Sequence, residues 1–404
     1  MVERTFDVVV SGGGPGGSAT AAFLARQGLS VALLDKANFP RDKACGDAIS
    51  GKSVRVLQQL GIVDWVESEP HVVANGVRFS SPAGDEVVIP FPSDPGVHPG
   101  YVSRRMVFDN VVFQAARKAG ATVFEGCEVT EVLLEDGHAV GVRTKDGDVF
   151  RAKVVVGADG ALSPVARGVG AYDRDPRHWV ASIRVYYEGV AGLDDNIEIH
   201  FSDPILPGYF WIFPLDNGMA NVGVGMLESE IKANGRDMKR DLEHFIREHP
   251  RFAPRFKDAR VVEKSQRGWI LPLGSKHRPI HGDGWVLVGD AASLIDPFSG
   301  EGIGNAMVSG RLAAATITKA LAARDTGAAA LAPYEAAVRA ELDRELMMSY
   351  KLQKLGRHTW LLNFVLRRAA KKPQVRDIIS QMLADREKKE EFGSVWFYIK
   401  LLLM

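Results

Sequence analysis

The sequence is poor in cysteine, has no excess of either charge and lacks a long apolar run. Its 404 residues include two cysteines, Cys45 and Cys127, with no C-x-x-C pair and no metal-ligand spacing. This pattern predicts no metal site and suits a reducing, cytoplasmic compartment. Basic and acidic residues number 50 each, so no net charge favours nucleic acid as a partner. No run approaches the length of a membrane span, and residues 1–5 lead into a strand pattern without a signal peptide.

The most informative stretch is a glycine-rich turn at residues 12–17. It follows an apolar run and precedes a helical pattern, which gives the order strand, tight turn and helix. Gly12, Gly14 and Gly17 have the G-x-G-x-x-G spacing, which lets the backbone approach a pyrophosphate at a helix N-terminus. A second apolar run ends in Asp35, at the distance where an acidic side chain binds ribose hydroxyls. The N-terminal unit therefore predicts an adenine dinucleotide, either NAD or FAD.

Two later segments distinguish between NAD and FAD. Each is an apolar strand that ends in a turn of glycine and aspartate, at residues 154–160 and 285–292. Asp290 can accept hydrogen bonds from a polyol such as ribityl. The glycines after Pro297 leave backbone N–H groups to face a flavin ring and stabilise negative charge at its edge. Either segment alone could be a plain strand cap, but the three motifs in this order favour FAD.

Together these motifs resemble FAD-dependent oxidoreductases of the para-hydroxybenzoate hydroxylase structural class, and within it the geranylgeranyl reductase family. The resemblance covers about residues 5–325 and implies that Asp35 binds the adenosine ribose and Asp290 the ribityl chain. Arg105 matches the arginine that this class has on the pyrophosphate side, with Arg104 as the one-position alternative and a solvated charge as the plainer one. The expected FAD-binding residues are Gly12, Gly14, Pro15, Gly16, Gly17, Asp35, Lys36, Cys45, Gly46, Arg105, Asp159, Gly160, Gly289, Asp290, Pro297, Gly300, Gly302, Ile303 and Gly304.

The predicted fold class is α/β (α+β), with a Rossmann-type FAD-binding domain, an inserted antiparallel-sheet substrate domain and a C-terminal helical region. Period-2 alternation indicates the antiparallel sheet. One helix is expected at about residues 229–249, and the chain is expected to become helical from about Pro333. The expected boundaries are residues 1–70, 101–175 and 276–330 for the FAD-binding domain, 71–100 and 176–275 for the substrate domain, and 331–404 for the helical region.

An aromatic segment at residues 207–215 indicates the kind of substrate. On a strand, Tyr209, Trp211 and Phe213 share one face, and such a row facing a flavin would form an apolar slot for a polyprenyl chain. The segment resembles the Y-x-W-x-F-P motif of geranylgeranyl reductases, and residues 220–223 resemble the stretch that follows it. An aromatic core strand is the alternative. Because the flavin motifs are present, we favour the pocket.

Cys45 lies in the loop after Asp35, within the letters KACG, which resemble the Cys-Gly element of the reductase family. The resemblance implies that Cys45 lies near the flavin ring and the reacting double bond, whereas an incidental buried cysteine is the alternative. We expect Cys45 to donate or orient a proton. Tyr209 and Trp211 are expected to stabilise positive charge on an unactivated alkene through their aromatic faces. The catalytic candidates are therefore Cys45, Tyr209 and Trp211.

The predicted function is reduction of C=C bonds in a prenylated lipid substrate by hydride from reduced FAD, with NAD(P)H or ferredoxin as the electron donor. A flavin-dependent halogenase is one alternative, because the aromatic segment also resembles W-x-W-x-I-P. Halogenases of that type rely on a lysine, and residues 53–117 contain none. An aromatic hydroxylase should have a smaller, more polar pocket, and a non-enzymatic flavoprotein would not need every flavin turn.

Two apolar runs near the C-terminus, residues 360–366 and 395–404, are open to two interpretations. They can pack as core against the FAD-binding domain. Alternatively, with the four basic residues that follow the first run, they can form an interfacial surface from which a lipid is drawn out of a membrane. Peripheral membrane contact is therefore one expected interaction.

Overall fold

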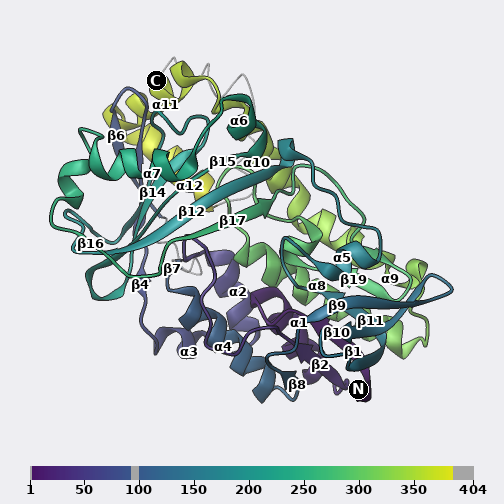
Figure 1. Ribbon diagram of the computed structural model, residues 1–404. Coiled ribbons are helices and arrows are strands. Elements are labelled where there is room, and N and C mark those ends of the chain that lie inside the picture. Colours follow the sequence, from purple (N-terminus) through teal and green to yellow (C-terminus); the bar gives the residue numbers. More distant parts are fainter. Residues whose placement is uncertain (1, 92–99, 385–404) are drawn as a thin grey trace.

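The computed structural model describes residues 2–91 and 100–384, which form two large sheets, one small sheet and their covering helices (Figure 1). Parallel and antiparallel strand pairs both occur, so the predicted mixed α/β class is confirmed. Residues 92–99 of the expected substrate domain and the apolar run at 395–404 lie outside the described residues.

The first sheet has the order β18-β19-β11-β1-β2-β8, with β10 and then β9 continuing from β11. Its central pairs are parallel, and the valines at residues 8–10 of β1 and 154–156 of β11 have no solvent exposure because the strands are covered on both faces there. Helices α1 (Pro15–Arg26) and α8 (Ile303–Ala322) pack against each other in the same core. The strands are β1 (Glu3–Ser11), β2 (Val31–Leu34), β8 (Thr122–Phe124), β9 (Val129–Glu135), β10 (His138–Thr144), β11 (Val149–Gly157), β18 (His281–Gly282) and β19 (Trp285–Leu287).

The second sheet has the order β16-β12-β15-β14-β13-β5-β6, with β17 also paired to β12. Its pairs are antiparallel except β13 with β5, which is parallel. The alternation predicted for the aromatic segment is confirmed, because Phe210 and Ile212 pack in one apolar cluster and Trp211 and Phe213 in another. The strands are β5 (Gly76–Ser80), β6 (Glu86–Pro90), β12 (Trp179–Glu188), β13 (Asn196–His200), β14 (Tyr209–Pro214), β15 (Met219–Leu227), β16 (Arg260–Val261) and β17 (Arg267–Pro272).

A small sheet lies beside the loop that carries Cys45. Strand β7 (Tyr101–Val102) pairs on one side with β3 (Ala48–Ile49) and on the other with β4 (Val72–Val73). The short pairing fixes the end of the loop after β2. Helices α2 (Gly51–Gln59) and α3 (Val63–Glu67) follow β3 in the chain, and helix α4 (Arg105–Lys118) follows β7.

Two helix predictions are wrong in their extent. The helix expected at 229–249 is two helices, α6 (Glu228–Ala233) and α7 (Met238–Arg247). Gly235 between them has φ +56°, and Asp237 caps α7 by accepting from the backbone N–H groups of Lys239 and Arg240.

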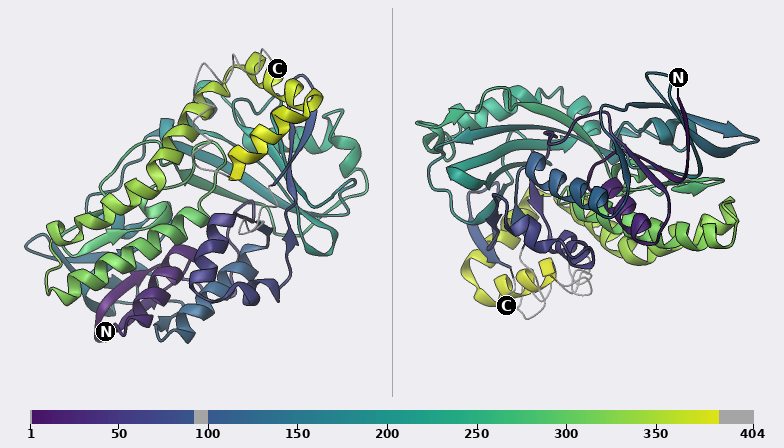
Figure 2. Two further views of the ribbon diagram at one scale, coloured as in Figure 1. Left: turned by 180° about the vertical axis from the view of Figure 1, so that it is seen from behind. Right: turned by 90° about the horizontal axis from the view of Figure 1, so that it is seen from below.

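The helical region begins before Pro333. Helix α9 (Ala328–Val338) contains this proline and runs through a π-type turn (Arg339–Asp343) into α10 (Arg344–Leu355). Helices α11 (Thr359–Lys371) and α12 (Pro373–Ala384) follow and pack against β6, as the yellow helices in Figure 2 show. The short helix α5 (Pro164–Gly168) follows β11. Among the helices of the described residues, none combines the length and the apolar character needed to cross a bilayer.

Candidate active site

One cavity of about 1330 Å³ extends from the glycine turn of the first sheet to the aromatic strand of the second. The predicted site residues line it with two exceptions, Gly17 and Gly304. A Cβ on Gly17 would lie 1.9 Å from the carbonyl oxygen of Gly12, so this glycine is needed for the turn behind the wall. The predicted residues on the wall are Gly12, Gly14, Pro15, Gly16, Asp35, Lys36, Cys45, Gly46, Arg105, Asp159, Gly160, Tyr209, Trp211, Gly289, Asp290, Pro297, Gly300, Gly302 and Ile303.

The glycine turn has the geometry of an anion cradle. Gly12 has φ +104°, and a Cβ there would lie 2.4 Å from the carbonyl oxygen of Ala158. Helix α1 begins at Pro15 after Gly14, whose lack of a side chain leaves the helix N-terminus facing the cavity. Backbone N–H groups at such an end bind phosphate oxygens. The turn therefore fits a pyrophosphate.

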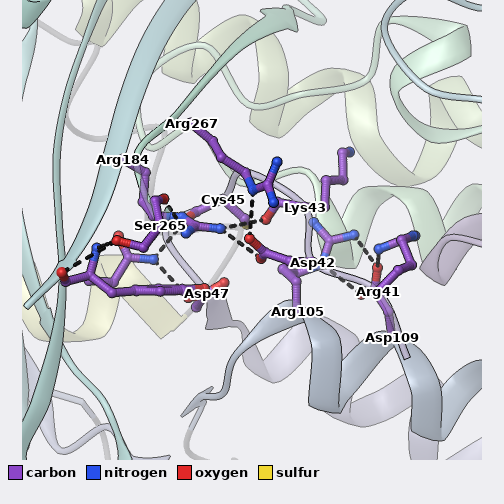
Figure 3. A network of polar contacts seen from close by, with 12 residues as sticks. Arg41, Asp42, Lys43, Cys45, Asp47, Arg105, Asp109, Arg184, Ser265 and Arg267 are labelled. Carbon is purple, nitrogen blue, oxygen red and sulfur yellow. Dashed lines mark hydrogen bonds and ion pairs between the residues drawn. The ribbon is translucent and has the colours of Figure 1, made fainter. Parts of the chain in front are cut away.

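Two arginines add positive charge beside this turn and share one carboxylate (Figure 3). Arg105, only 3% exposed, donates from Nε and Nη2 to the two oxygens of Asp109, at 2.6 and 2.7 Å. Arg41 donates to the same carboxylate at 2.6 Å, and its guanidinium lies 3.7 Å from a Cβ placed on Gly14. One carboxylate neutralises one of the two cations, so a net positive charge remains for a pyrophosphate.

Arg105 is thus the arginine at the cavity, and it is not a solvated charge. Arg104 instead pairs with Asp216 at 3.0 Å. Burial acts to raise the pKa of Asp109, but Arg105 and Arg41 outweigh it and hold that pKa below its usual value. Sequence reasoning missed Arg41, whose loop position carries no motif and whose partner lies 68 residues further along the chain.

Asp35 occupies the position expected for a ribose ligand. Its Oδ2 accepts from the backbone N–H of Gly13 at 2.7 Å, and its Oδ1 from that of Ala37 at 2.8 Å. A carboxylate has about four acceptor positions, so both oxygens can still accept from hydroxyl groups. The two backbone bonds hold the carboxylate toward the cavity that it lines.

The opposite rim of the cavity is built from the turns around α8. Gly289 and Gly300 have φ +59° and +75°, and Gly302 precedes the first residue of α8. Asp290 is held by Lys43 at 3.1 Å, a contact that the motifs did not reveal. These turns expose backbone and the N-terminus of α8 to the cavity, an arrangement that fits the negatively charged edge of a reduced flavin.

A buried cluster of charge lies next to these turns. Lys52 donates to the side-chain oxygen of Asn305 at 2.6 Å and pairs with Glu345 at 3.0 Å and Glu301 at 3.7 Å. Lys52 lines the cavity. It comes directly before residues 53–117, the range without lysine that argued against a halogenase. Its ammonium group is held by two carboxylates and an amide.

The aromatic row lines the other half of the cavity. Tyr209, Trp211 and Phe213 follow one another along β14, with ring centroids 6.0 and 6.3 Å apart. Gly223 on the neighbouring strand β15 leaves the space that the Trp211 indole fills, since a Cβ there would lie 2.3 Å from the ring. The hydroxyl of Tyr209 donates to the carbonyl oxygen of Ser299 at 2.9 Å, and burial raises its pKa.

Cys45 lies in the loop that passes between the glycine turns and this row. Its neighbour Gly46 lies against Phe213, where an added Cβ would be 3.0 Å from the ring. The guanidinium of Arg105 faces Cys45. Burial acts to lower the pKa of Arg105, but Asp109 and then Cys45 raise it well above its usual value. The cavity therefore brings together the groups predicted for the cofactor and those predicted for catalysis.

Comparison with known proteins agrees with this geometry. The model of the family described as FAD binding domain matches residues 5–341. Menaquinone reductase of Mycobacterium tuberculosis is 35% identical over 78% of this chain and 76% of its own, and digeranylgeranylglycerophospholipid reductase of Methanocella arvoryzae is 33% identical over 88% of each.

Solved structures share the same fold. A geranylgeranyl bacteriochlorophyll reductase-like protein from Thermoplasma acidophilum superposes with a TM-score of 0.81 at 26% identity, over 96% of this chain and 98% of its own. The flavin-dependent brominase Bmp2 superposes with a TM-score of 0.77 at 24% identity over 94% of each chain, a likeness that shows the fold alone. FAD is the cofactor of this protein, and its Rossmann-type FAD-binding fold is confirmed.

We predict that Gly12→Ala lowers the FAD content of the purified protein. A side chain at φ +104° costs about 1–2 kcal/mol, and its Cβ would meet the Ala158 carbonyl where the cofactor turn is formed. The matched control is Gly28→Ala, which has φ +80° but open space around it. The ratio of flavin to protein absorbance should fall in the first variant alone. Equal FAD content in both variants would contradict the cradle.

A second prediction concerns pH. Burial raises the pKa of Asp47 from 3.8 to about 6, against the opposing effects of Arg184, Tyr186 and Asn221. A raised folded-state pKa means that stability is full below the unfolded pKa and is lost as the pH rises through the folded one. Asp47→Asn has no carboxyl to ionise and keeps this stability, so its free energy of unfolding in urea should exceed the wild-type value by about 3 kcal/mol at about pH 7. The difference should close toward about pH 4, and a difference that does not depend on pH would contradict this assignment.

Proposed function

The chain belongs to the family of flavoproteins that share the FAD binding domain, and we propose that it saturates C=C bonds of a polyprenyl chain on a lipid. It is an FAD-dependent oxidoreductase of the geranylgeranyl reductase type, which acts on CH–CH groups. The observation that carries the proposal is the row of Tyr209, Trp211 and Phe213 on the wall of the same cavity as the glycine turns. A long apolar wall suits a polyprenyl chain.

The cofactor-binding roles follow from the chemistry of the wall. In the proposal, the N-terminus of α1 with Arg41 and Arg105 holds the pyrophosphate, and Asp35 accepts from ribose hydroxyls. Asp290 accepts from the ribityl chain, and the N-terminus of α8 faces the flavin edge. Reduced FAD supplies the hydride of the reaction.

The remaining chemistry falls to the second half of the cavity. An unactivated alkene that receives hydride at one carbon needs a proton at the other, and positive charge develops as the proton arrives. The faces of Tyr209 and Trp211 stabilise that charge. Cys45 donates that proton from Sγ, and the guanidinium of Arg105 faces the sulfur.

The proposal also includes what surrounds this site. The electron donor is NAD(P)H or ferredoxin. The chain divides into an FAD-binding domain, a substrate domain and a helical region at the boundaries given from the sequence. The lipid substrate makes the protein a peripheral partner of a membrane.

The activity is tested by incubating the anaerobically reduced protein with geranylgeranyl phospholipids, menaquinones and geranylgeranyl diphosphate in turn. Product masses that rise in steps of two hydrogens would identify the carrier. No gain of hydrogen on any of them would contradict the proposal. Oxygen, halide and aromatic substrates would then test the halogenase and hydroxylase alternatives.

For the catalytic residues, we predict that Trp211→Ala lowers turnover of a prenyl substrate about 10- to 100-fold while FAD stays bound, because a charge-stabilising face is lost. Cys45→Ala is expected to lower turnover by a similar factor. Steady-state rates and FAD content are measured together for each variant. Loss of FAD from Trp211→Ala would make the tryptophan structural, and full turnover by Cys45→Ala would remove Cys45 from proton transfer.

Membrane contact is predicted at the end of α10 and the start of α11. Trp360 is 67% exposed, and Arg357, three residues earlier in the chain, lines the cavity and pairs with Glu230. An exposed tryptophan among basic side chains is typical of a surface that binds anionic lipid. Trp360→Ser should therefore reduce co-sedimentation with vesicles of anionic phospholipid. Val261→Ser, at another exposed apolar residue, is the control, and equal sedimentation of both variants would contradict the surface.

A further inference from the structure

The environment of Asp47 lowers the stability of the fold, and the proposed mechanism gives this residue no role. It is fully buried, its backbone has φ +67°, and its Oδ1 has no hydrogen-bond partner. A non-glycine residue in this conformation and an unpaired buried carboxyl oxygen each lower stability. Unfavourable conformations persist where the surrounding structure holds them in place, and they are found most often at functional sites. The neighbours of Asp47 in the chain, Cys45, Gly46 and Ala48, line the cavity, whereas Asp47 itself does not. Figure 3 shows Asp47 within the network of polar contacts around this loop.

The other oxygen of Asp47 is the centre of a small network. Oδ2 accepts from the hydroxyl of Tyr186 at 2.7 Å and from Nδ2 of Asn221 at 2.8 Å. Both donors lie on the second sheet, on β12 and β15. Asp47 therefore ties the loop after β2 to the sheet that carries the aromatic row.

Asn221 extends this network to both proposed catalytic groups. Its Nδ2 also donates to the backbone carbonyl of Cys45 at 2.7 Å, and its Oδ1 accepts from Nε1 of Trp211 at 2.9 Å. The amide thus uses three of its four hydrogen-bonding positions. One fully buried side chain connects the loop at Cys45 with the indole of Trp211.

We propose that Asp47 and Asn221 are positioning residues, which fix the Cys45 backbone and the Trp211 ring at a set separation on the two sides of the reacting double bond. The inference rests on the proposed function, since it gives these two residues their place in the reaction. Misplacement of about 1 Å can lower a rate about 100-fold. A shared amide prevents such movement more effectively than two independent contacts, because each bond restricts the other.

The geometry of the network also indicates which property of Asp47 is needed to hold the loop. Both of its bonds end on Oδ2, so asparagine with its oxygen in that place keeps both, whereas alanine keeps neither. The charged or titratable groups that face the carboxyl are Arg184 and Tyr186 on β12 and Arg105 on α4. Protonation at the unpaired Oδ1 leaves the two bonds in place. The role is therefore that of an acceptor, and the negative charge is not required for it.

Alkylation of the oxidised FAD-loaded protein tests the geometry without any prenyl substrate. The chain has two cysteines, so Cys127 at the other end of the cavity is an internal reference for Cys45. With iodoacetamide and mass spectrometry, we expect the rate at Cys45 relative to Cys127 to change about fivefold in Asp47→Ala and Asn221→Ala. Asp47→Asn should keep the wild-type ratio. Tyr186→Phe, which removes one bond and keeps the ring, should move the ratio less and in the same direction.

Turnover supplies the second readout. In Asp47→Ala and Asn221→Ala, kcat for the prenyl substrate should fall about tenfold with a smaller change in KM, because substrate binding by the apolar wall is retained. Asp241→Ala is the matched control. This buried carboxyl lies on α7, a helix that packs on the opposite face of the second sheet from Trp211, and it pairs with Arg236 just before the helix. It should change neither the alkylation ratio nor kcat.

Unchanged alkylation and kcat in Asp47→Ala would overturn the inference, as would an Asp47→Asn variant that behaves like Asp47→Ala. If Asp47→Ala does not fold, Tyr186→Phe decides the matter by the same two readouts, and a wild-type result there overturns the inference. A changed alkylation ratio in a protein without prenyl reduction would show that the proposed function is wrong although the network holds the loop.

Discussion

The structure depends on one loop, residues 41–47, which polar contacts bind to helix α4, to the turn after β19 and to strands of the second sheet. It separates the half of the cavity that carries positive charge from the half that carries aromatic rings. Apolar packing alone would hold the sheets together but would not fix the loop, because hydrophobic contact has no preferred direction. Directed hydrogen bonds and ion pairs supply that fixation. The contacts are Arg41 with Asp109, Asp42 with Arg184 and Arg267, Lys43 with Asp290, and Asp47 with Tyr186 and Asn221.

Each contact of the loop also places a group of the cavity wall. Arg41 is bound to the same carboxylate as Arg105, which brings two cations to the glycine turn. Lys43 holds Asp290 at the far rim. Two cations on one buried carboxylate, one of them fully enclosed and the other half-buried, leave a net positive charge, so the site favours a bound pyrophosphate. The binding of the cofactor and the order of the loop therefore support each other.

Much of this could be predicted from the sequence where the signal is local. The glycine spacing specifies a turn that only glycine can form, and the alternation of residues 209–213 specifies which rings share a face. Arg41, Lys52 and Asp47 could not be predicted, because their partners lie far along the chain and no periodicity marks them. The prediction of a single helix at 229–249 was wrong because many helices tolerate a glycine in their middle, so Gly235 did not indicate a break. The N-terminal cap at Asp237 starts a second helix.

In the proposed function an alkene chain and the flavin share the one cavity, so that hydride passes directly between them. The most direct measurement is a single turnover, in which anaerobically reduced protein is mixed with a geranylgeranyl lipid and the visible absorbance of the flavin is followed. We expect oxidised-flavin absorbance to return as the lipid gains hydrogen, in proportion to the double bonds reduced. A flavin that stays bleached with the lipid and is reoxidised only when oxygen is admitted would contradict it.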